Sequence, residues 1–330
     1  MRAAFVPEPG RVEVGDFPVP TAELAGDLVV RMHRASICGS DVHSVFHGFH
    51  NADRFGFPGY PGHEGIGEVV DSRSAEFSVG DIVLTVPVGD IGGCFAEFQL
   101  IADKQVVRLP EGGDTERLLM AQQYGTTLYS MRMFWPDAGN WGTPGTVAIM
   151  GAGSAGLFFL QQAKQLGFEN LIISDLNEDR LKVARSLGAQ TVVHAPKESF
   201  IDAVHEVTDG EGADLVIEAA GFDRLRADAI AAVRIRGTVG FFGFPERLGM
   251  AEFPMFDAFR KIVRIQWVGG TQAEPGLVAF KDAVRHIDEG SINVDYCLGP
   301  AYGIEEVPET LAIADAQGHG AVKLSIDLRT

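Results

Sequence analysis

Two patterns of apolar and polar residues divide the chain. Up to about residue 110, short β-branched runs such as 28–32, 67–70 and 82–86 are bounded by Gly, Pro and Asp. Runs of this length with such boundaries predict β-strands. From about residue 120, apolar runs of strand length alternate with amphipathic segments of helix length. The first third is therefore predicted to be β-rich, and the middle to alternate between strand and helix.

The alternating part can be divided into individual elements. Alternation of strands and helices on this scale is typical of an α/β fold with a parallel, doubly wound sheet. Two more helices and a final strand are predicted after about residue 270, and we expect this tail to return to the first domain. The predicted strands are 147–150, 171–174, 192–194, 215–218, 239–242 and 322–328, and the predicted helices are 155–166, 178–187, 276–287 and 307–314.

Length, charge and cysteine content narrow the class of protein. A chain of 330 residues exceeds the usual size of one hydrophobic core, so two domains are expected. The net charge of −18 gives an acidic surface, which repels phosphate backbones and anionic lipid, so neither nucleic acid nor a membrane is an expected partner. The N-terminal segment does not resemble a signal peptide. The three cysteines lie far apart, which argues against a disulfide framework and favours the cytoplasm.

A glycine motif lies between the first strand and helix of the alternating part. Residues 145–167, GTVAIMGAGSAGLFFLQQAKQLG, contain Gly151-x-Gly153-x-x-Gly156. In this context the motif predicts a dinucleotide site, although a nucleotide-free α/β turn is the alternative. The three glycines would make the tight turn, admit the pyrophosphate to the backbone, and let the helix pack on the strand. Ser154 and Ala155 would present the helix N-terminus to the phosphates.

Asp175 ends the second strand of the alternating part, in LIISDLNEDR. An acidic side chain there can bind both ribose hydroxyls of an adenosine and would repel a 2′-phosphate, which favours NAD over NADP. Arg180, one helical turn further on, could soften this preference. Asp175 is also a candidate N-cap of the following helix, and the two roles can coexist.

A second constellation lies within the first 65 residues. Residues 35–43, ASICGSDVH, carry a thiol, a hydroxyl, a carboxylate and an imidazole, and His63 and Glu64 follow about 25 residues after Cys38. A thiolate and an imidazole from separate loops suit a zinc site, although this spacing alone is only suggestive. Cys38 could otherwise be a nucleophile or a buried core thiol.

Three elements in this order, CGSDVH, GHEGIGEV and GAGSAG, resemble the zinc-dependent medium-chain dehydrogenase/reductases of the alcohol dehydrogenase superfamily. VGDIV and GGCFAEF add to the match, and ICGSDVH is most similar to the sorbitol (polyol) dehydrogenase-like branch. The resemblance implies a GroES-like, β-rich catalytic domain in residues 1–122, a Rossmann domain with a doubly wound parallel sheet in 123–268, and a return to the catalytic domain in 269–330. It also implies a homodimer or homotetramer.

The resemblance further implies a chemical role for the polar residues of these motifs. A catalytic zinc ion stabilises an alkoxide, so the substrate hydroxyl can lose its proton near neutral pH. The implied roles are zinc ligation for Cys38 and His63, a hydrogen bond to the substrate oxygen for Ser40, orientation of the ligating histidine for Asp41, the outer base of the proton relay for His43, and a carboxylate beside or on the metal for Glu64.

Two departures from the family pattern matter. The lobe that carries four closely spaced cysteines is missing, so one catalytic zinc and no structural zinc are expected. The third catalytic ligand, a Cys, Glu or Asp in the family, is matched by Gln123, with Thr127 as a cofactor contact four residues later. A neutral amide oxygen is a poorer zinc ligand than a thiolate or carboxylate. Three alternatives are therefore open: weak ligation by Gln123, ligation by Glu64 in its place, or an empty or metal-poor site. We favour zinc on Cys38, His63 and Glu64, with Gln123 close.

The predicted function is that of an NAD-dependent zinc alcohol or polyol dehydrogenase, which transfers a hydride between NAD and a secondary alcohol or the matching ketone. One alternative is a metal-independent quinone or enoyl reductase of the same superfamily, which the neutral Gln123 keeps open. Another is a non-catalytic NAD-binding protein, against which the intact set of Ser40, Asp41 and His43 argues. The substrate itself is left open.

Overall fold

The computed structural model describes residues 1–88, 92–136, 145–195 and 197–329. The chain forms two compact units. Unit 1 comprises Met1–Thr126 and Gln272–Thr330, and unit 2 comprises Thr127–Thr271. Their boundaries lie close to the expected ones at residues 122 and 268. Residues 89–91 lie outside the described residues. They belong to the segment in which this chain was expected to lack the cysteine-rich lobe of the family.

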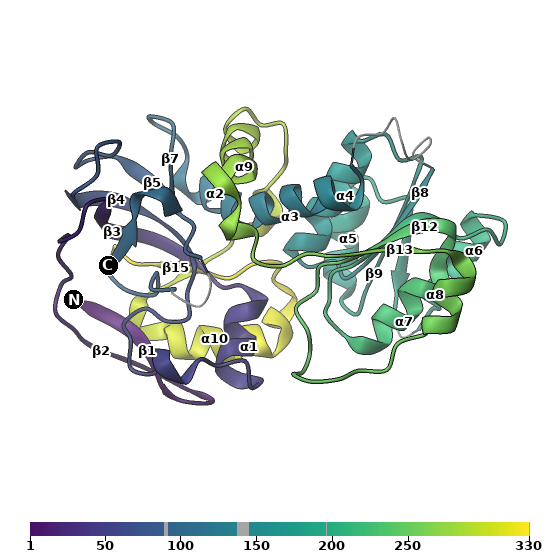
Figure 1. The fold of residues 1–330 in the computed structure, drawn as a ribbon, viewed down its shortest axis with the longest axis horizontal. Coiled ribbons are helices and arrows are strands. Elements are labelled where there is room, and N and C mark those ends of the chain that lie inside the picture. Colours follow the sequence, from purple (N-terminus) through teal and green to yellow (C-terminus); the bar gives the residue numbers. More distant parts are fainter. Residues whose placement is uncertain (89–91, 137–144, 196, 330) are drawn as a thin grey trace. The chain divides into compact units, whose positions relative to one another are not determined.

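Unit 1 is built around a seven-stranded sheet of order β14-β15-β3-β4-β5-β7, with β6 paired to β3. The tail of the chain supplies β14 and β15, so yellow C-terminal strands adjoin purple N-terminal ones in Figure 1. The strands are β3 (Asp27–Ser36), β4 (Glu64–Ser72), β5 (Ile82–Thr85), β6 (Phe98–Ala102), β7 (Val106–Arg108), β14 (Ala301–Tyr302) and β15 (Ser325–Asp327), with β1 (Arg2–Glu8) and β2 (Arg11–Asp16) as a separate antiparallel pair.

The last strand is shorter than the expected 322–328. Ser325 pairs with Ser36, the final residue of β3, so residues 322–324 lie beyond the end of the partner strand. They have no ladder to join there, although the Ile37 amide still donates to the Leu324 carbonyl at 3.0 Å. The expectation of a strand over 322–324 was therefore wrong.

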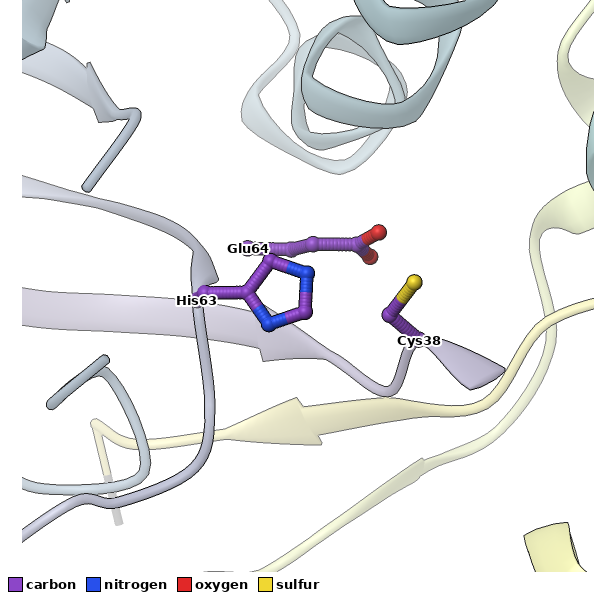
Figure 2. A group of neighbouring side chains, drawn as sticks. All are labelled: Cys38, His63 and Glu64. Carbon is purple, nitrogen blue, oxygen red and sulfur yellow. The ribbon is translucent and has the colours of Figure 1, made fainter. Parts of the chain in front are cut away.

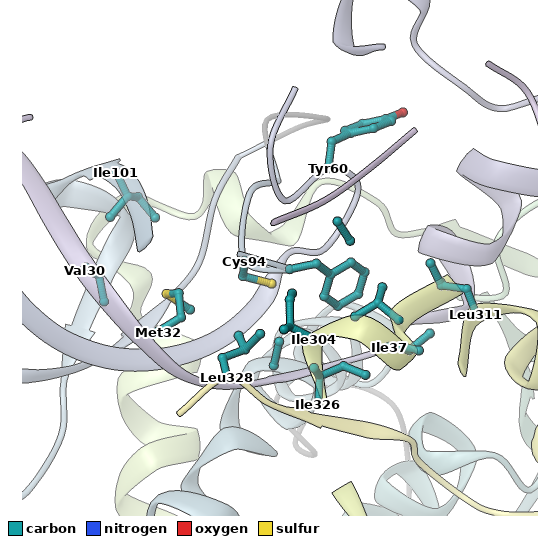
Figure 3. Packing of buried hydrophobic residues seen from close by; sticks show 14 of the residues in the cluster. Val30, Met32, Ile37, Tyr60, Cys94, Ile101, Ile304, Leu311, Ile326 and Leu328 are labelled. Atoms are coloured by element: carbon teal, nitrogen blue, oxygen red, sulfur yellow. The ribbon is translucent and has the colours of Figure 1, made fainter. Parts of the chain in front are cut away.

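The core of unit 1 joins residues from both ends of the chain. Val30 and Met32 of β3 belong to the same buried cluster as Ile304 and Ile326 of the tail (Figure 3). Cys94 lies in this cluster and is fully buried, and burial raises the pKa of its thiol well above the usual value. Cys94 therefore packs as a small buried hydrophobe.

Unit 2 contains a six-stranded parallel sheet of order β10-β9-β8-β11-β12-β13. Helices α4 and α5 contact each other and β9, while α6, α7 and α8 form a second row, which gives the doubly wound arrangement expected (Figure 1). The elements are β8 (Thr146–Met150), α4 (Ser154–Gln165), β9 (Asn170–Asp175), α5 (Glu178–Leu187), β10 (Thr191–His194), α6 (Phe200–Val207), β11 (Ala213–Glu218), α7 (Asp223–Ala232), β12 (Val233–Phe241), α8 (Met255–Lys261) and β13 (Arg264–Trp267).

The other helices belong wholly or partly to unit 1. Helix α3 continues from unit 1 into unit 2, because the boundary between the units falls after Thr126. Among the described residues, every helix is too short or too polar to cross a membrane. These helices are α1 (Gly39–Phe46), α2 (Thr115–Leu119), α3 (Ala121–Phe134), α9 (Val278–Asp288) and α10 (Val307–Asp315).

Candidate metal and cofactor sites

Asp41 fixes the turn that carries Cys38. Strand β3 ends at Ser36 and α1 begins at Gly39, so Cys38 occupies the N-cap position of the helix. The Cys38 backbone N–H donates to Asp41 Oδ2 at 2.9 Å, and the other oxygen, Oδ1, lies 2.7 Å from His63 Nδ1. Asp41 is only 1% exposed. One buried carboxylate therefore orients both the backbone of Cys38 and the ring of His63.

Strand pairing brings Glu64 to the same place. Glu64 is the first residue of β4 and pairs with Ser36 at the end of β3, two residues before Cys38. Candidate ligand atoms of Cys38, His63 and Glu64 all lie within 4.8 Å of one another. Figure 2 shows the three side chains converging from these two neighbouring strand ends. The two separate motifs of the sequence therefore form one cluster.

The cluster is suited to zinc. A thiolate, an imidazole and a carboxylate are the groups that zinc prefers, and catalytic sites use three protein ligands and leave one position open. Because Asp41 holds Nδ1 of His63, the ring can offer Nε2 to a metal. Burial would lower the pKa of His63, but the Asp41 carboxylate and the hydrogen bond with Cys38 hold that pKa well above its usual value. Zinc would therefore have to displace a proton from the ring.

Lys323 is a member of this cluster that the sequence motifs did not reveal. Its side chain is 3% exposed, and its Nζ lies 2.6 Å from Glu64 Oε2. Ser36 Oγ donates to the same carboxylate oxygen. Burial would lower the pKa of Lys323 and raise that of Glu64, but the charge of each partner outweighs this. The pKa of Lys323 is raised and that of Glu64 is lowered, so both remain charged near neutral pH.

Gln123 reaches the cluster through Lys323. The Lys323 ammonium donates to Gln123 Oε1 at 3.0 Å, so the amide oxygen points to the lysine. Gln123 is thus close to Glu64, as expected. Its ligating atom is bound to a cation, however, which favours Glu64 over Gln123 as the third ligand.

Ser40 and His43 lie three residues apart on α1, so they share one face of the helix. His43 is partly buried, and its ring centroid lies 5.1 Å from that of His47 and 5.5 Å from that of Phe49. Burial, and then the neighbouring His47, lower the pKa of His43, against an opposing effect of Asp315. The imidazole is therefore neutral at neutral pH and able to accept a proton.

The glycine turn in unit 2 has the geometry that the motif predicted. Gly151 has φ 99°, which favours glycine, and Gly153 is the N-cap of α4. A Cβ on Gly156 would lie 1.8 Å from the Gly151 carbonyl oxygen, whereas one on Gly153 would meet nothing within 4 Å. Ser154 and Ala155 form the first turn of α4. The open space at Gly153 is where a pyrophosphate could approach the backbone.

Asp175 lies at the carboxyl end of β9, beside this turn. Its Oδ2 accepts from the Ala152 N–H at 2.6 Å and its Oδ1 accepts from the Asn177 N–H at 2.8 Å. The N-cap of α5 is Asn177, whose side chain accepts from the amides of Asp179 and Arg180. The expectation that Asp175 caps this helix was wrong, because Asn177 is closer to the first turn.

The other two predicted cofactor residues are placed differently. Arg180 lies in the first turn of α5, near Asp175 in sequence and fold. Thr127 is fully buried, and its hydroxyl accepts from Gln162 Nε2 at 2.8 Å. Its role as a cofactor contact therefore stays a prediction.

Comparison with known proteins identifies the family of the chain. The model of the alcohol dehydrogenase GroES-like domain matches residues 24–111, and that of the zinc-binding dehydrogenases matches residues 155–283. Zinc-type alcohol dehydrogenase B of Aspergillus flavus is 32% identical over 301 residues, which cover 81% of this chain and 68% of the relative. The chain belongs to the zinc-binding dehydrogenases. It is thus an oxidoreductase of the medium-chain superfamily that acts on alcohols, and the expected family and fold class are confirmed.

Other relatives of this zinc-binding dehydrogenase are more distant. Sorbitol dehydrogenase of Bacillus subtilis is 26% identical over 269 residues, 75% of this chain and 76% of the relative. The solved alcohol dehydrogenase TADH of Thermus sp. ATN1 superposes with a TM-score of 0.83 at 24% identity, covering 99% of each chain. The dehydrogenase therefore has the fold of the solved alcohol dehydrogenases over its whole length.

A signal for Lys323 is present in the sequence of the dehydrogenase. The segment VKLSIDL, residues 322–328, was predicted as a strand, and in it a lysine lies among apolar residues. Lysine is rarely buried without a charged partner, so its position within an apolar strand indicates a buried carboxylate nearby. The partner could not be named from the sequence, because Glu64 lies 259 positions away and is joined to Lys323 only through strand pairing.

Proposed function

We propose that the protein is an NAD-dependent zinc dehydrogenase that interconverts a secondary alcohol or polyol and the matching ketone. The observation that carries this proposal is the convergence of Cys38, His63 and Glu64 within 4.8 Å, with Asp41 on the far nitrogen of His63. These three residues would hold the zinc ion. When bound, zinc polarises the substrate oxygen and favours loss of its proton.

The residues of α1 would manage that proton. Ser40, two residues after Cys38, would accept it from the substrate hydroxyl. His43 lies one turn further along the same face, and its lowered pKa leaves it neutral, so it could accept the proton and pass it on towards solvent. Asp41 cannot serve as this base, since both of its oxygens hold Cys38 and His63.

The glycine turn and Asp175 support NAD as the hydride carrier. Space beside Gly153 admits a pyrophosphate to the N-terminus of α4. Asp175 places a negative charge beside the turn, which would bind ribose hydroxyls and repel the 2′-phosphate of NADP. The similarity to sorbitol dehydrogenase of Bacillus subtilis supports a polyol or other secondary alcohol as the substrate class.

Metal analysis and turnover test the proposal together. The purified protein should contain about one zinc ion per chain, and it should form NADH from members of a secondary-alcohol and polyol panel. It should use NAD in preference to NADP. Protein that carries no zinc, and that stays inactive with every alcohol after zinc is added, would refute the proposal.

One observation favours a second candidate, a metal-independent quinone or enoyl reductase. The Lys323 ammonium binds both Glu64 and Gln123, so a cation already neutralises part of the proposed metal site. Under this alternative, reduction of a quinone would survive both a strong chelator and the Cys38→Ala substitution. Loss of activity under either treatment would exclude it.

A further inference from the structure

Lys323 has no role in the proposed reaction, yet it is buried beside the candidate metal ligands. It lies two residues before β15, whose Ser325 pairs with Ser36 of β3, and Ser36 pairs in turn with Glu64 of β4. The ends of three neighbouring strands thus bring the lysine and the carboxylate together. The lysine side chain is 3% exposed and that of Glu64 is 1% exposed. A buried charge of this kind persists only when it is paired.

The contacts of the ammonium are specific. It lies 2.6 Å from Glu64 Oε2 and donates to Gln123 Oε1 at 3.0 Å. Two of its three N–H donors are therefore directed at the two residues that compete for the third ligand position. The lysine turns the Gln123 carbonyl towards itself, and it shares Oε2 of Glu64 with the Ser36 hydroxyl.

Charge makes the arrangement unfavourable for a dication. Among the candidate ligands, the negative charges are those of the Cys38 thiolate and the Glu64 carboxylate, but Lys323 offsets that of Glu64, and Gln123 supplies none. Metal and ammonium would lie on the same carboxylate, in a site removed from water, where repulsion between like charges is poorly screened. Any ion held by Glu64 therefore binds against the field of Lys323.

We propose that Lys323 is a positioning residue that sets the metal affinity of the site, because its ammonium competes with the metal for Glu64 and keeps the Gln123 carbonyl away from the coordination position. The site therefore holds zinc weakly and exchangeably, with Cys38, His63 and Glu64 as its ligands. This inference rests on the proposed zinc site, but it concerns binding and not turnover.

Metal affinity can be measured without any substrate. Zinc is titrated into metal-free protein against a chromophoric chelator, and cobalt is titrated in parallel, because its thiolate charge-transfer band reports ligation by Cys38. Lys323→Met and Lys323→Gln remove the charge, and each should bind zinc at least about tenfold more tightly than the wild type, which corresponds to about 1.4 kcal/mol. The cobalt band should persist in both variants.

Lys281→Met is the matched control. Lys281 is an exposed residue of α9 in unit 1, so its replacement removes the same charge from the same unit without touching the cluster. It should leave the zinc affinity within about twofold of the wild type, since exposed charges at a distance are screened by salt.

Several results would overturn the inference. Unchanged zinc affinity in both neutral variants, or no zinc binding in any protein, would show that Lys323 does not set the affinity. Weaker binding would show that Lys323 only holds Glu64 in place for the metal. Should both neutral variants fail to fold, Gln123→Glu decides, because it gives the ammonium a second carboxylate and should also tighten zinc at least about tenfold. No tightening there would overturn the inference as well.

Failure of the inference is distinguishable from failure of the proposed function. The proposed function is judged by NADH formation in zinc-saturated wild type. The inference is judged by the ratio of the zinc dissociation constants of the variants and the wild type. This ratio can be changed or unchanged whether the protein is active or inactive.

Discussion

The glycine turn of unit 2 and the cluster of candidate metal ligands in unit 1 are built in opposite ways. Residues 151–156 form the turn from one contiguous segment, and its requirements are steric, such as the close approach of Gly156 to the Gly151 carbonyl. The metal cluster gathers residues from near positions 36–41, 63–64, 123 and 323, and its requirements are electrostatic. A local steric site can be recognised from a motif, whereas a dispersed charged site can be recognised only in part.

The largest expected effect separates two thiols of unit 1, the partly buried Cys38 and the buried Cys94. Cys38→Ala should abolish zinc binding and lower kcat/KM roughly a thousandfold, because metal polarisation contributes several kcal/mol to such reactions. Zinc content and NADH formation measure this. Cys94→Ala is the control, since Cys94 is packed in the core, and it should keep zinc and activity. Equal losses in both variants would contradict the assignment of Cys38.

The steric nature of the turn can be tested with two glycines. Gly156→Ala should lower the free energy of unfolding by about 3 kcal/mol, because its Cβ would meet the Gly151 carbonyl at 1.8 Å and α4 would have to move. Gly153→Ala should change it by less than about 0.5 kcal/mol, since the space around it is open. Denaturant unfolding measures both. Gly153→Ala should instead weaken NAD binding, as seen by titration of the cofactor. Equal stability of the two variants would contradict this picture.

Charge enters the cofactor region at Asp175. Asp175→Asn removes the negative charge and leaves one acceptor oxygen, which can serve the backbone amide of Ala152 or of Asn177 but not both. The ratio of kcat/KM for NAD to that for NADP should fall about tenfold, or about 1.4 kcal/mol. Asp179→Asn, an exposed position on α5, removes the same charge and should leave the ratio unchanged. A shift of equal size in Asp179→Asn would point to a general charge effect.

The metal cluster should also make unit 1 sensitive to pH when metal is removed. The pKa of His63 is raised well above its usual value in the fold, so the protonated ring stabilises the metal-free protein below pH about 6.5. That contribution is lost as the pH rises through the folded pKa. Thermal unfolding in the presence of a chelator should therefore show that Tm falls by a few degrees as the pH rises. A fall of this size corresponds to a loss of about 1 kcal/mol in the free energy of unfolding.

Asp41→Asn is the control for this pH effect. It removes the charge that raises the pKa of His63, so the fall of Tm with pH should become shallower. Zinc affinity in the wild type should show the opposite trend and increase with pH, because the metal displaces the proton of the ring. A Tm of the metal-free wild type that does not change with pH would contradict the assignment.

The smallest effect on activity is expected at helix α8, which carries none of the residues assigned to the metal or cofactor sites. The homodimer or homotetramer implied by the resemblance stays a prediction. Helix α8 exposes Phe256 by 72% and Phe259 by 77%, and an apolar surface of this kind is typical of contacts between copies of a chain. Phe259→Glu should lower the mass measured by light scattering and leave kcat almost unchanged. Leu24→Glu, equally exposed in unit 1, should not change the mass.

The parts of the fold that the sequence predicted share short-range causes. The boundaries of α5 were predicted to the residue, because Gly188 ends the helix in the left-handed region and polar residues start it. The Gly151–Gly156 turn followed from backbone sterics alone. By contrast, the strand expected over 322–324 was wrong, because its length depends on where the partner β3 ends.

The candidate site was predictable as far as its residues interact with near neighbours or stand in motifs. Cys38, Asp41, His63 and Glu64 belong to two motifs, and the structure brings them into one cluster. Lys323 was missed because nothing near it in sequence explains its burial. The neutral Gln123 marked a departure from the family pattern, since position 123 supplies an amide oxygen that accepts from the Lys323 ammonium.

The discontinuous construction of unit 1 has a consequence for the order of events during synthesis. During synthesis, residues 127–271 are complete and able to fold as one unit before the residues of β15 have been added to the chain, since domains fold as units. Until residue 323 emerges, Glu64 has no cation to oppose its burial, and the strand end that carries Cys38 has no neighbour on one side. A nascent chain stalled before this point would thus have a complete unit 2 and an incomplete metal site. Zinc supplied during translation would then reach Glu64 before Lys323 can pair with it.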